Sequence, residues 1–287
     1  MLLLVDLDGV VYRGQTPVPG VAAVLADRVA RGDDVVYVTN LAASYRGDYV
    51  ARLEGMGAPV SLDRIVSSAR ATALYLANLD PRPARTLVLG APGLVRELTE
   101  VGLEVLEAGE RGALLAAGAR GGSATLAEEY EVLGRPDVVV VGLDPELTYA
   151  KLAAAVVSIR AGARFVATNL DPALPTEGSY RPGAGSLVAA VKAATGVTPV
   201  SLGKPAPEIM VEAARMAGAN AADAIMIGDG LATDIGAAKA VGARSILMLT
   251  GVTKRSQLEG LSAAEAPDEV AADAAELAVI LDRLAGS

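Results

Sequence analysis

Residues 3–9 read Leu-Leu-Val-Asp-Leu-Asp-Gly, so a short apolar run ends in two aspartates, Asp6 and Asp8, followed by Gly9. The apolar run predicts a buried strand, and the glycine predicts a turn at its end. Two carboxylates held close together are costly without a cation or a shared proton. Because α/β enzymes place their chemistry at the carboxyl ends of strands, this pair is the first candidate for a functional site.

The composition of the chain limits the chemistry that it can perform. Its 287 residues are 52% hydrophobic and 21% charged, enough for one large domain or two smaller ones. It has no cysteine and no histidine, which excludes disulfides, thiolate nucleophiles, His-containing triads and His-bound or Cys-bound zinc. Acid–base catalysis must therefore come from Asp, Glu, Lys or Tyr. Any metal must be held by oxygen ligands, which favours Mg²⁺, Mn²⁺ or Ca²⁺.

Charge and hydropathy bear on partners and location. The net charge of -9 argues against nucleic acid as a partner, and a single Phe without any Trp leaves few surfaces on which bases could stack. No apolar run reaches the ~18 residues that a membrane span needs, and the first residues carry no basic leader. We therefore expect a soluble cytoplasmic protein that binds neither nucleic acid nor a membrane.

Short runs rich in β-branched residues alternate with amphipathic helical patterns along most of the chain. Apolar residues share one helical face over 21–29 and again over 152–159, and Thr148 is placed to cap the second of these helices. Such alternation predicts an α/β fold with a Rossmann-like, doubly wound parallel sheet. Strands are expected at 35–39, 86–89, 138–141, 164–168, 224–227 and 245–249.

Two proline-containing interruptions divide the chain. One lies at 81–83 and the other at 174–183, and about 100 residues lie between them, the usual size of a small domain. We expect residues 1–80 and 182–287 to form one discontinuous domain, with a second α/β domain inserted at 81–181. Within the insertion, the Ala-, Gly- and Glu-rich stretch 108–135 is interpreted as a loop with a short helix over 124–133.

Three further polar groups lie at strand ends or before helices. They are Thr39-Asn40, Gly203-Lys204-Pro205 and the segment 228–234, which contains Asp229 and Asp234. Since the carboxyl ends of parallel strands share one edge, we expect these groups to converge with the opening aspartates. Carboxylates can hold a divalent cation, the Thr hydroxyl can hold an anion, and the Lys supplies a fixed positive charge. This set is suited to phosphoryl transfer, in which positioning and charge neutralisation do most of the work.

The same four segments have a known counterpart. Asp-Leu-Asp-Gly-Val at 6–10, Thr-Asn at 39–40, Gly-Lys-Pro at 203–205 and Gly-Asp-x-x-x-Thr-Asp at 228–234 resemble, in this order, the four motifs of the haloacid dehalogenase superfamily of phosphatases. Further segments resemble a subgroup with a large α/β cap, which includes NagD-type and phosphoglycolate or 4-nitrophenyl phosphatase-like proteins. These segments are 141–144, 167–171 and 182–185, and the resemblance covers nearly the whole chain.

The resemblance implies catalytic roles for matching residues. Asp6 would attack phosphorus and form an aspartyl-phosphate, since an ionised carboxylate needs no base to activate it. Asp8 would protonate the leaving alcohol and then activate the water that hydrolyses the intermediate. Thr39, Asn40 and Lys204 would hold the phosphoryl oxygens.

The resemblance also implies a Mg²⁺ site and substrate contacts. Mg²⁺ would be held by the Asp6 carboxylate, the Asp8 backbone carbonyl and Asp229, while Asp234 would order metal-bound water or the catalytic lysine. Asn169 and Asp171, in the inserted domain, would face the substrate. Both could equally be ordinary turn residues, and Asp234 could be the N-cap of a helix that begins at 235.

The function indicated is a Mg²⁺-dependent phosphatase of small phosphorylated metabolites, with a cap that closes over the site and through which the subgroup often dimerises. A receiver-like signalling domain is disfavoured, because it is a single small domain whose phosphate acceptor comes later in the chain. The remaining alternative is a non-catalytic phospho-ligand-binding protein on the same scaffold. The departures from the motifs at Leu41, Ala42 and Gly230 favour this alternative. The presence of Asp8 argues against it, because binding alone needs no general acid.

Overall fold

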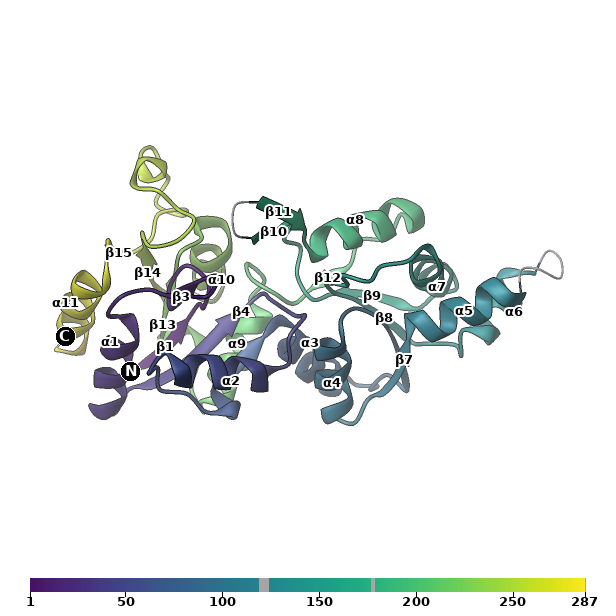
Figure 1. Ribbon diagram of the computed structural model, residues 1–287, viewed down its shortest axis with the longest axis horizontal. Helices are drawn as coiled ribbons and strands as arrows, with labels where there is room; N and C mark the ends of the chain where they lie inside the picture. Colours follow the sequence, from purple (N-terminus) through teal and green to yellow (C-terminus); the bar gives the residue numbers. More distant parts are fainter. Residues whose placement is uncertain (119–123, 177–178, 287) are drawn as a thin grey trace. The chain divides into compact units, whose positions relative to one another are not determined.

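The computed structural model describes residues 1–118, 124–176 and 179–286, and the chain divides into two compact units. The first unit comprises Met1–Thr39, Arg46–Ser67 and Gly203–Ser287, and the second comprises Asn40–Tyr45 and Ser68–Leu202. Each unit has its own parallel sheet with helices on it (Figure 1). The α/β fold expected from the sequence is confirmed.

The first unit is built on a six-stranded parallel sheet whose central strand is the apolar run that opens the sequence. This strand is buried along its whole length, as expected for a strand of a parallel sheet covered on both faces. The strands predicted at 35–39, 224–227 and 245–249 are confirmed. In order across the sheet, the strands are β15 (Glu269–Ala271), β14 (Arg244–Met248), β13 (Ala224–Gly228), β1 (Leu2–Val5), β4 (Asp34–Thr39) and β5 (Ile65–Ser67).

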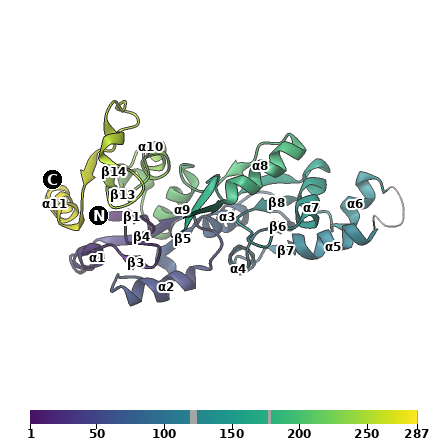
Figure 2. The same ribbon diagram turned by 45° about the horizontal axis from the view of Figure 1, so that its top comes forward.

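Helices and a small hairpin complete the first unit. Helices α1 and α11 lie side by side, as both ribbon views show (Figures 1 and 2). The hairpin of β2 (Tyr12–Arg13) and β3 (Thr16–Pro17) follows directly after the turn that ends the first strand. The helices are α1 (Val21–Ala30), α2 (Arg46–Gly55), α9 (Glu208–Met216), α10 (Gly236–Val241) and α11 (Ala274–Ala285), with 3-10 turns at Leu62–Arg64, Ala221–Asp223 and Arg255–Leu258 and a π-helical turn at Leu231–Ile235.

The second unit contains a five-stranded parallel sheet with one hydrophobic cluster on each face. Alternate residues of one strand divide between the clusters: Val139 and Val141 join one, and Val138 and Val140 join the other. This explains why the strand is an unbroken run of valines, because both of its faces are covered. In order across the sheet, the strands are β12 (Val200–Ser201), β9 (Arg164–Ala167), β8 (Val138–Val141), β6 (Arg85–Leu89) and β7 (Glu104–Glu107), with a separate hairpin of β10 (Ala173–Thr176) and β11 (Ser179–Pro182).

The helices of the second unit cover these two clusters. Thr148 caps its helix as predicted, since the Thr148 hydroxyl accepts the backbone N–H of Lys151 at 3.2 Å. The helices are α3 (Ser68–Ala77), α4 (Pro92–Glu100), α5 (Ala108–Gly118), α6 (Leu126–Val132), α7 (Tyr149–Arg160) and α8 (Ala184–Thr195).

Two helices extend the second unit beyond the expected insertion at 81–181. Ala69, Ala73 and Leu76 on α3 pack into one hydrophobic cluster of the second unit, and Leu187 and Val191 on α8 pack into the other. The two units therefore divide near residues 67 and 202, whereas the expected boundaries at 80 and 182 follow the prolines. Pro81 and Pro83 lie in the loop between α3 and β6, whereas Pro175 and Pro182 lie in the strands of the β10–β11 hairpin.

The interpretation of 108–135 as a loop with one short helix is wrong for its first part. Residues 108–118 form α5, whereas α6 lies within the helix predicted over 124–133, and 119–123 lie outside the described residues. Within α5, Gly112 serves close packing. A Cβ built there would lie 2.3 Å from the carbonyl oxygen of Ala150 on α7, so only glycine allows α5 and α7 to approach this closely. The two helices lie side by side in Figures 1 and 2.

Within the part of the chain that the structure describes, no helix combines the length and the apolar character that crossing a membrane requires.

We expect Gly112→Ala to destabilise the protein by about 1–3 kcal/mol, because the new methyl group forces two packed helices apart. Gly118→Ala is the matched control on the same helix, since a Cβ there meets nothing within 4 Å. The control should be neutral or slightly stabilising, by up to ~1 kcal/mol, because alanine favours a helix over glycine. Urea denaturation of both variants checks this, and equal free energies of unfolding would contradict the packing role of Gly112.

Candidate active site

The aspartate that ends the first strand lies at the carboxyl edge of the first sheet. Asp6 follows β1 directly, and its backbone N–H donates to the carbonyl of Ile227 on β13 at 2.9 Å. Thr39 ends β4 on the other side, and Asp229 follows β13. Asp6, Thr39 and Asp229 are all buried. The parallel register thus brings three of the predicted site residues to one edge.

Lys204 joins this edge to the loop that follows β13. Its Nζ lies 2.5 Å from Oδ1 of Asp6 and 2.7 Å from Oδ1 of Asp234, and it donates to the carbonyl of Val38 at 3.1 Å. Only 3% of Lys204 is exposed. A lysine this deeply buried is stable as a cation only because carboxylates surround it.

Burial and charge act in opposite directions on the Lys204–Asp6 pair. Burial would lower the pKa of Lys204, but the neighbouring Asp234 and Asp6 carboxylates outweigh it and raise that pKa above its ordinary value. Burial raises the pKa of Asp6 well above its usual range; Lys204 opposes this, and Asp234 and Asp229 add to it. The cluster contains three acids and one lysine, so the protein alone leaves it short of positive charge.

Asp234 is held by the loop that it follows. Its Oδ2 accepts the backbone N–H groups of Asp229 at 3.0 Å and Gly230 at 2.8 Å. It is not the N-cap of α10, whose N-cap residue is Ile235. The alternative interpretation of Asp234 as a helix cap is therefore wrong, and its carboxylate shapes the turn after β13 and pairs with Lys204.

Asp229 is enclosed by two glycines from distant parts of the sequence. A Cβ built at Gly9 would lie 2.1 Å from Oδ2 of Asp229, and one at Gly251 would lie 1.8 Å from the same atom. Gly9 also has a φ of 86°, which side chains rarely adopt. The same oxygen accepts the backbone N–H of Val252 at 2.7 Å. Burial, and secondly the nearby Asp234, raise the pKa of Asp229 to about 7.

The donor set suits a hard divalent cation. Asp6, Asp229 and Asp234 each offer a carboxylate oxygen, and the three oxygens lie within 4.8 Å of one another. All three side chains are buried, and the chain has no histidine or cysteine to offer nitrogen or sulfur. Oxygen-only ligands are those that Mg²⁺ prefers, and its charge would offset the excess of carboxylates. These residues therefore fit a Mg²⁺ ion.

Asp8 differs from Asp6 in its surroundings. Its side chain is exposed, whereas that of Asp6 is buried. Nearby protein atoms nonetheless raise the pKa of Asp8, and the charge of Arg52 and the backbone N–H groups of Gly14 and Gly9 partly offset this. One carboxyl is thus locked into a charge cluster, and the other faces outward.

The remaining predicted residues form a cluster of their own in the second unit. The Asn40 side-chain amide donates to Oδ2 of Asp171 at 3.0 Å, and the Asn169 amide donates to the Asn40 carbonyl at 2.8 Å. That carbonyl also accepts the hydroxyl of Ser68 at 2.6 Å, and Asn169 Oδ1 accepts the backbone N–H of Asp171 at 3.1 Å. The structure therefore brings Asn40, Asn169 and Asp171 together, with Asn40 at the centre.

The structure explains two of the three residues that depart from the family motifs. Ala42 is 1% exposed and packs into a hydrophobic cluster of the second unit, where a polar residue would be costly. At Gly230, a Cβ would lie 2.2 Å from Oγ1 of Thr233, so this tight turn leaves little room for a side chain. Nothing in the structure explains Leu41.

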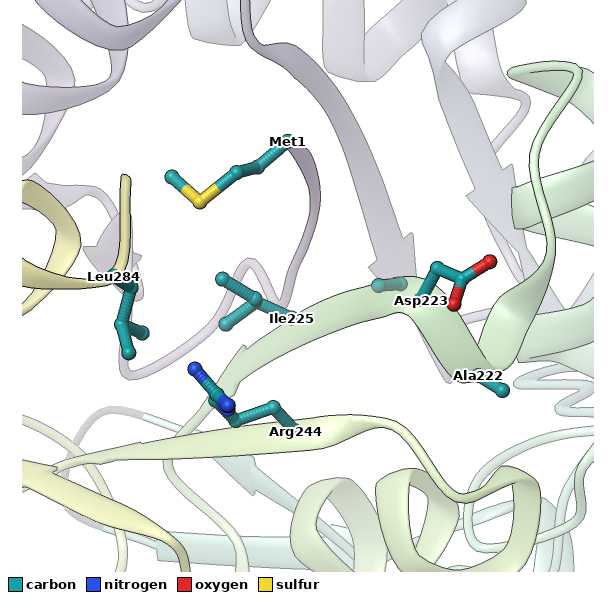
Figure 3. A pocket seen from close by; sticks show the side chains of 7 residues that line it. Met1, Ala222, Asp223, Ile225, Arg244 and Leu284 are labelled. Carbon is teal, nitrogen blue, oxygen red and sulfur yellow. The ribbon is translucent and has the colours of Figure 1, made fainter. Parts of the chain in front are cut away.

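A cavity of about 280 Å³ lies at the opposite edge of the same sheet (Figure 3). Met1, Asp223 and Arg244, which line it, stand at or just before the starts of β1, β13 and β14. In Figure 3, the side chains of Met1, Ile225 and Leu284 point toward the space beside Arg244. None of its lining residues belongs to the charge cluster, and the chemistry of the site lies at the carboxyl edge.

Sequence reasoning missed several contributors. Val252 acts through its backbone N–H, which no residue type reveals, and Thr250 donates its hydroxyl to the carbonyl of Gly9 at 2.7 Å. Both lie directly after the predicted strand 245–249, so the position of that strand end was the available signal. Arg52, on a helix of mixed composition, gave no signal.

We expect Asp229→Asn to stabilise the metal-free protein and to remove stabilisation by Mg²⁺. Since the folded pKa of Asp229 is raised above its unfolded value of 3.8, the wild type loses stability as pH rises toward about 7. Neutral Asn avoids this loss, so the advantage of the variant should grow between pH 4 and 7 and then level off. At about 1.4 kcal/mol per pKa unit, we expect on the order of 2 kcal/mol at pH 8 after allowing for coupling within the cluster.

Thermal unfolding at pH 5 and pH 8, with and without Mg²⁺, measures this. Asp223→Asn is the control, because Asp223 is exposed and precedes the other end of the same strand. It should leave the Mg²⁺-dependent increase in Tm intact. An undiminished increase in Asp229→Asn would show that Mg²⁺ binds elsewhere.

Comparison with known proteins identifies the family to which the chain belongs. A profile described as haloacid dehalogenase-like hydrolase matches residues 3–104, and one described as HAD-hydrolase-like matches residues 201–277. The chain is 34% identical over 256 residues to the acid sugar phosphatase of Staphylococcus saprophyticus, covering 89% of both proteins. It is 38% identical over 250 residues to the D-glycerol 3-phosphate phosphatase of Mycobacterium tuberculosis, covering 87% of this chain.

The chain aligns with 63% of the length of that mycobacterial protein. A crystal structure of glycerol phosphate phosphatase from the same organism, in complex with magnesium, superposes with a TM-score of 0.80 at 34% identity, covering 96% of this chain and 75% of the other. The similarity to the acid sugar phosphatase extends over most of both chains, and the matched segments contain all four sequence motifs. The chain belongs to the haloacid dehalogenase-like hydrolases.

Proposed function

We propose that this chain is a Mg²⁺-dependent phosphatase that hydrolyses small phosphomonoesters through an aspartyl-phosphate. The observation that carries the proposal is the buried Lys204, held between Asp6 and Asp234 at the edge where Asp229 also lies. Such a group of fixed charges serves phosphoryl transfer, because it stabilises charge on the transferring group without having to reorganise. The named activities of the relatives support the same reaction class.

In the first step, an oxygen of Asp6 bonds to phosphorus as the bond to the leaving oxygen breaks. Lys204 favours the ionised form of Asp6 that this attack needs. Asp8 gives its proton to the departing oxygen, so that an alcohol leaves and Asp8 becomes a carboxylate. An exposed carboxyl with a raised pKa suits this role, because it can reach the substrate and its surroundings favour the protonated form that donates the proton.

In the second step, water attacks the phosphorus of the aspartyl-phosphate. Asp8 takes a proton from that water, the bond to Asp6 breaks, and inorganic phosphate leaves. Thr39 and Lys204 stand at the same sheet edge and are proposed to hold the phosphoryl oxygens. The Asp6 carboxylate, the Asp8 backbone carbonyl and Asp229 would hold Mg²⁺, which supplies positive charge to the phosphoryl group when bound.

The second unit is proposed to be the cap, and the first the catalytic core. The cap is inserted in the sequence between the strands that carry the site. A domain of this kind limits the access of large substrates when it closes. Asn40, Asn169 and Asp171 are proposed to face the substrate, and their mutual hydrogen bonds would hold them ready for that role. A cytoplasmic location and a homodimer formed through the cap stay predictions from the sequence.

We expect Asp6→Asn to lower hydrolysis of 4-nitrophenyl phosphate by at least about 10³-fold, because the amide is a poor nucleophile. Release of 4-nitrophenol with saturating Mg²⁺ measures this, with the exposed Asp223→Asn as the control that keeps wild-type turnover. If the purified wild type turns over none of a panel of phosphomonoesters, the chain is a binding protein and the proposal fails.

Asp8→Asn should separate proton transfer from metal binding. We expect turnover to fall by about 10²–10⁴-fold, the usual contribution of general acid–base catalysis. Mg²⁺ affinity, measured by calorimetry, should stay within about threefold of wild type, because the contact proposed for Asp8 is a backbone carbonyl. A large loss of Mg²⁺ affinity would instead make the Asp8 side chain a ligand.

The cap predicts a preference for small substrates. Sugar phosphates, glycerol phosphates, phosphoglycolate and nucleotides should be hydrolysed with higher kcat/KM than a folded phosphoprotein. The measurement is phosphate release across this panel at equal concentrations. Faster release from the phosphoprotein would rule out a substrate limit set by the cap.

A further inference from the structure

The loop that follows β14 covers one oxygen of the proposed Mg²⁺ ligand Asp229. Val252 donates its backbone N–H to Oδ2 of Asp229 at 2.7 Å. A Cβ built at Gly251 would lie 1.8 Å from the same oxygen, so the backbone of the loop packs directly against it. The loop therefore encloses Oδ2 with main-chain atoms, and glycine at 251 is what makes this approach possible.

The turn after β1 reaches the same oxygen from another part of the sequence. A Cβ built at Gly9 would lie 2.1 Å from Oδ2 of Asp229 and 3.0 Å from Cα of Gly251, so the two glycines also lie close to each other. Gly9 directly follows Asp8, whose backbone carbonyl is a proposed ligand of Mg²⁺. The placement of Gly9 therefore bears on two of the proposed ligands.

A side-chain hydrogen bond joins the loop to the turn. The hydroxyl of Thr250 donates to the carbonyl of Gly9 at 2.7 Å, and Thr250 is 7% exposed. The two residues are 241 positions apart in the chain, so local turn geometry does not account for the contact. Thr250 precedes Gly251, and its hydroxyl thus fastens together the two backbone segments that enclose Oδ2.

The other oxygen of Asp229 has different surroundings. Among the described residues, Oδ1 accepts no hydrogen bond. Asp6, Asp229 and Asp234 can each offer one oxygen to a cation, and with Oδ2 enclosed, Oδ1 is the oxygen that Asp229 has to offer. Binding through a single oxygen suits Mg²⁺, which demands near-octahedral geometry. Ca²⁺ is larger, takes more ligands and readily binds both oxygens of a carboxylate.

We propose that Thr250 is a positioning residue that keeps Asp229 a one-oxygen ligand and thereby favours Mg²⁺ over Ca²⁺. The inference rests on the Mg²⁺-dependent function proposed above. By tying the loop to Gly9, the Thr250 hydroxyl holds both backbone segments against Oδ2. Without that hydrogen bond the segments separate, the carboxylate of Asp229 can rotate, and both of its oxygens become available to the larger cation.

The test measures the Kd of Mg²⁺ and of Ca²⁺ by calorimetry, with each chloride salt titrated into metal-free protein. Thr250→Val keeps the shape of the side chain and removes the hydroxyl. We expect it to raise the Kd of Mg²⁺ about tenfold and that of Ca²⁺ by no more than about twofold, because only Mg²⁺ depends on the one-oxygen geometry. Thr250→Ser, which keeps the hydroxyl, should stay within about twofold of wild type for both cations.

The matched control is Thr72→Val. Thr72 is fully buried in the second unit, and its hydroxyl also donates to a backbone carbonyl, that of Ser68, at 2.7 Å. Its loss should lower Tm and change neither Kd, because it removes an equivalent hydrogen bond away from the charge cluster. Thermal unfolding without metal shows whether each variant folds, and if Thr250→Val does not, Thr250→Ala carries the test.

The ratio of the two Kd values separates positioning from general packing. An unchanged ratio in Thr250→Val, or the same change of ratio in Thr72→Val, would overturn the inference and leave the phosphatase proposal standing. A wild type that binds no Mg²⁺, or that hydrolyses 4-nitrophenyl phosphate equally well without it, would instead remove the proposed Mg²⁺ dependence, and the inference with it.

Discussion

The ammonium group of Lys204, buried between the Asp6 and Asp234 carboxylates, is the interaction on which the rest of the site depends. Removing a charge from water costs several kcal/mol, and breaking a buried pair by deleting one partner typically costs ~3–5 kcal/mol. The three groups therefore fix one another's positions. They also fix the end of β1, the end of β4 through the Val38 carbonyl, and the turn after β13.

This arrangement serves function better than stability. A pair of one lysine and one aspartate would be neutral, but the cluster adds Asp229 and Asp234, and burial raises the pKa of Asp229 to about 7. The fold tolerates three buried carboxylates beside one lysine at the carboxyl edge of its sheet. None of these residues lies at the opposite edge. Such local conflict with stability is typical of sites that recruit a cation and a phosphoryl group.

Much of the fold and of the site could be predicted, and the limits have physical causes. Apolar runs gave the central strands, because burial on both faces leaves a strong pattern, and strand ends then brought Asp6, Thr39 and Asp229 to one edge. Short strands such as β5 and β12 were missed because two or three residues carry too little pattern. Helix α5 was missed because Gly112 is dictated by its neighbour Ala150, not by its own helix. The backbone donor at Val252 and the hydrogen bond from Thr250 to Gly9 are tertiary contacts that residue types do not reveal. The boundaries between the units followed packing by α3 and α8, which the prolines do not mark.

The long sequence separation within the charge cluster has a consequence for how the protein is made. Asp6 and Lys204 are 198 residues apart, and the second unit ends at Leu202, just before the lysine. During synthesis from the N-terminus, the ribosome therefore releases every residue of the second unit while β13, β14 and β15 are still missing. The inserted unit, with a complete sheet and two hydrophobic clusters, can fold first, and β1 must wait with one edge unpaired for its partner β13. The first aspartate to be made gains its full set of charged neighbours only when Asp229 and Asp234 have left the ribosome.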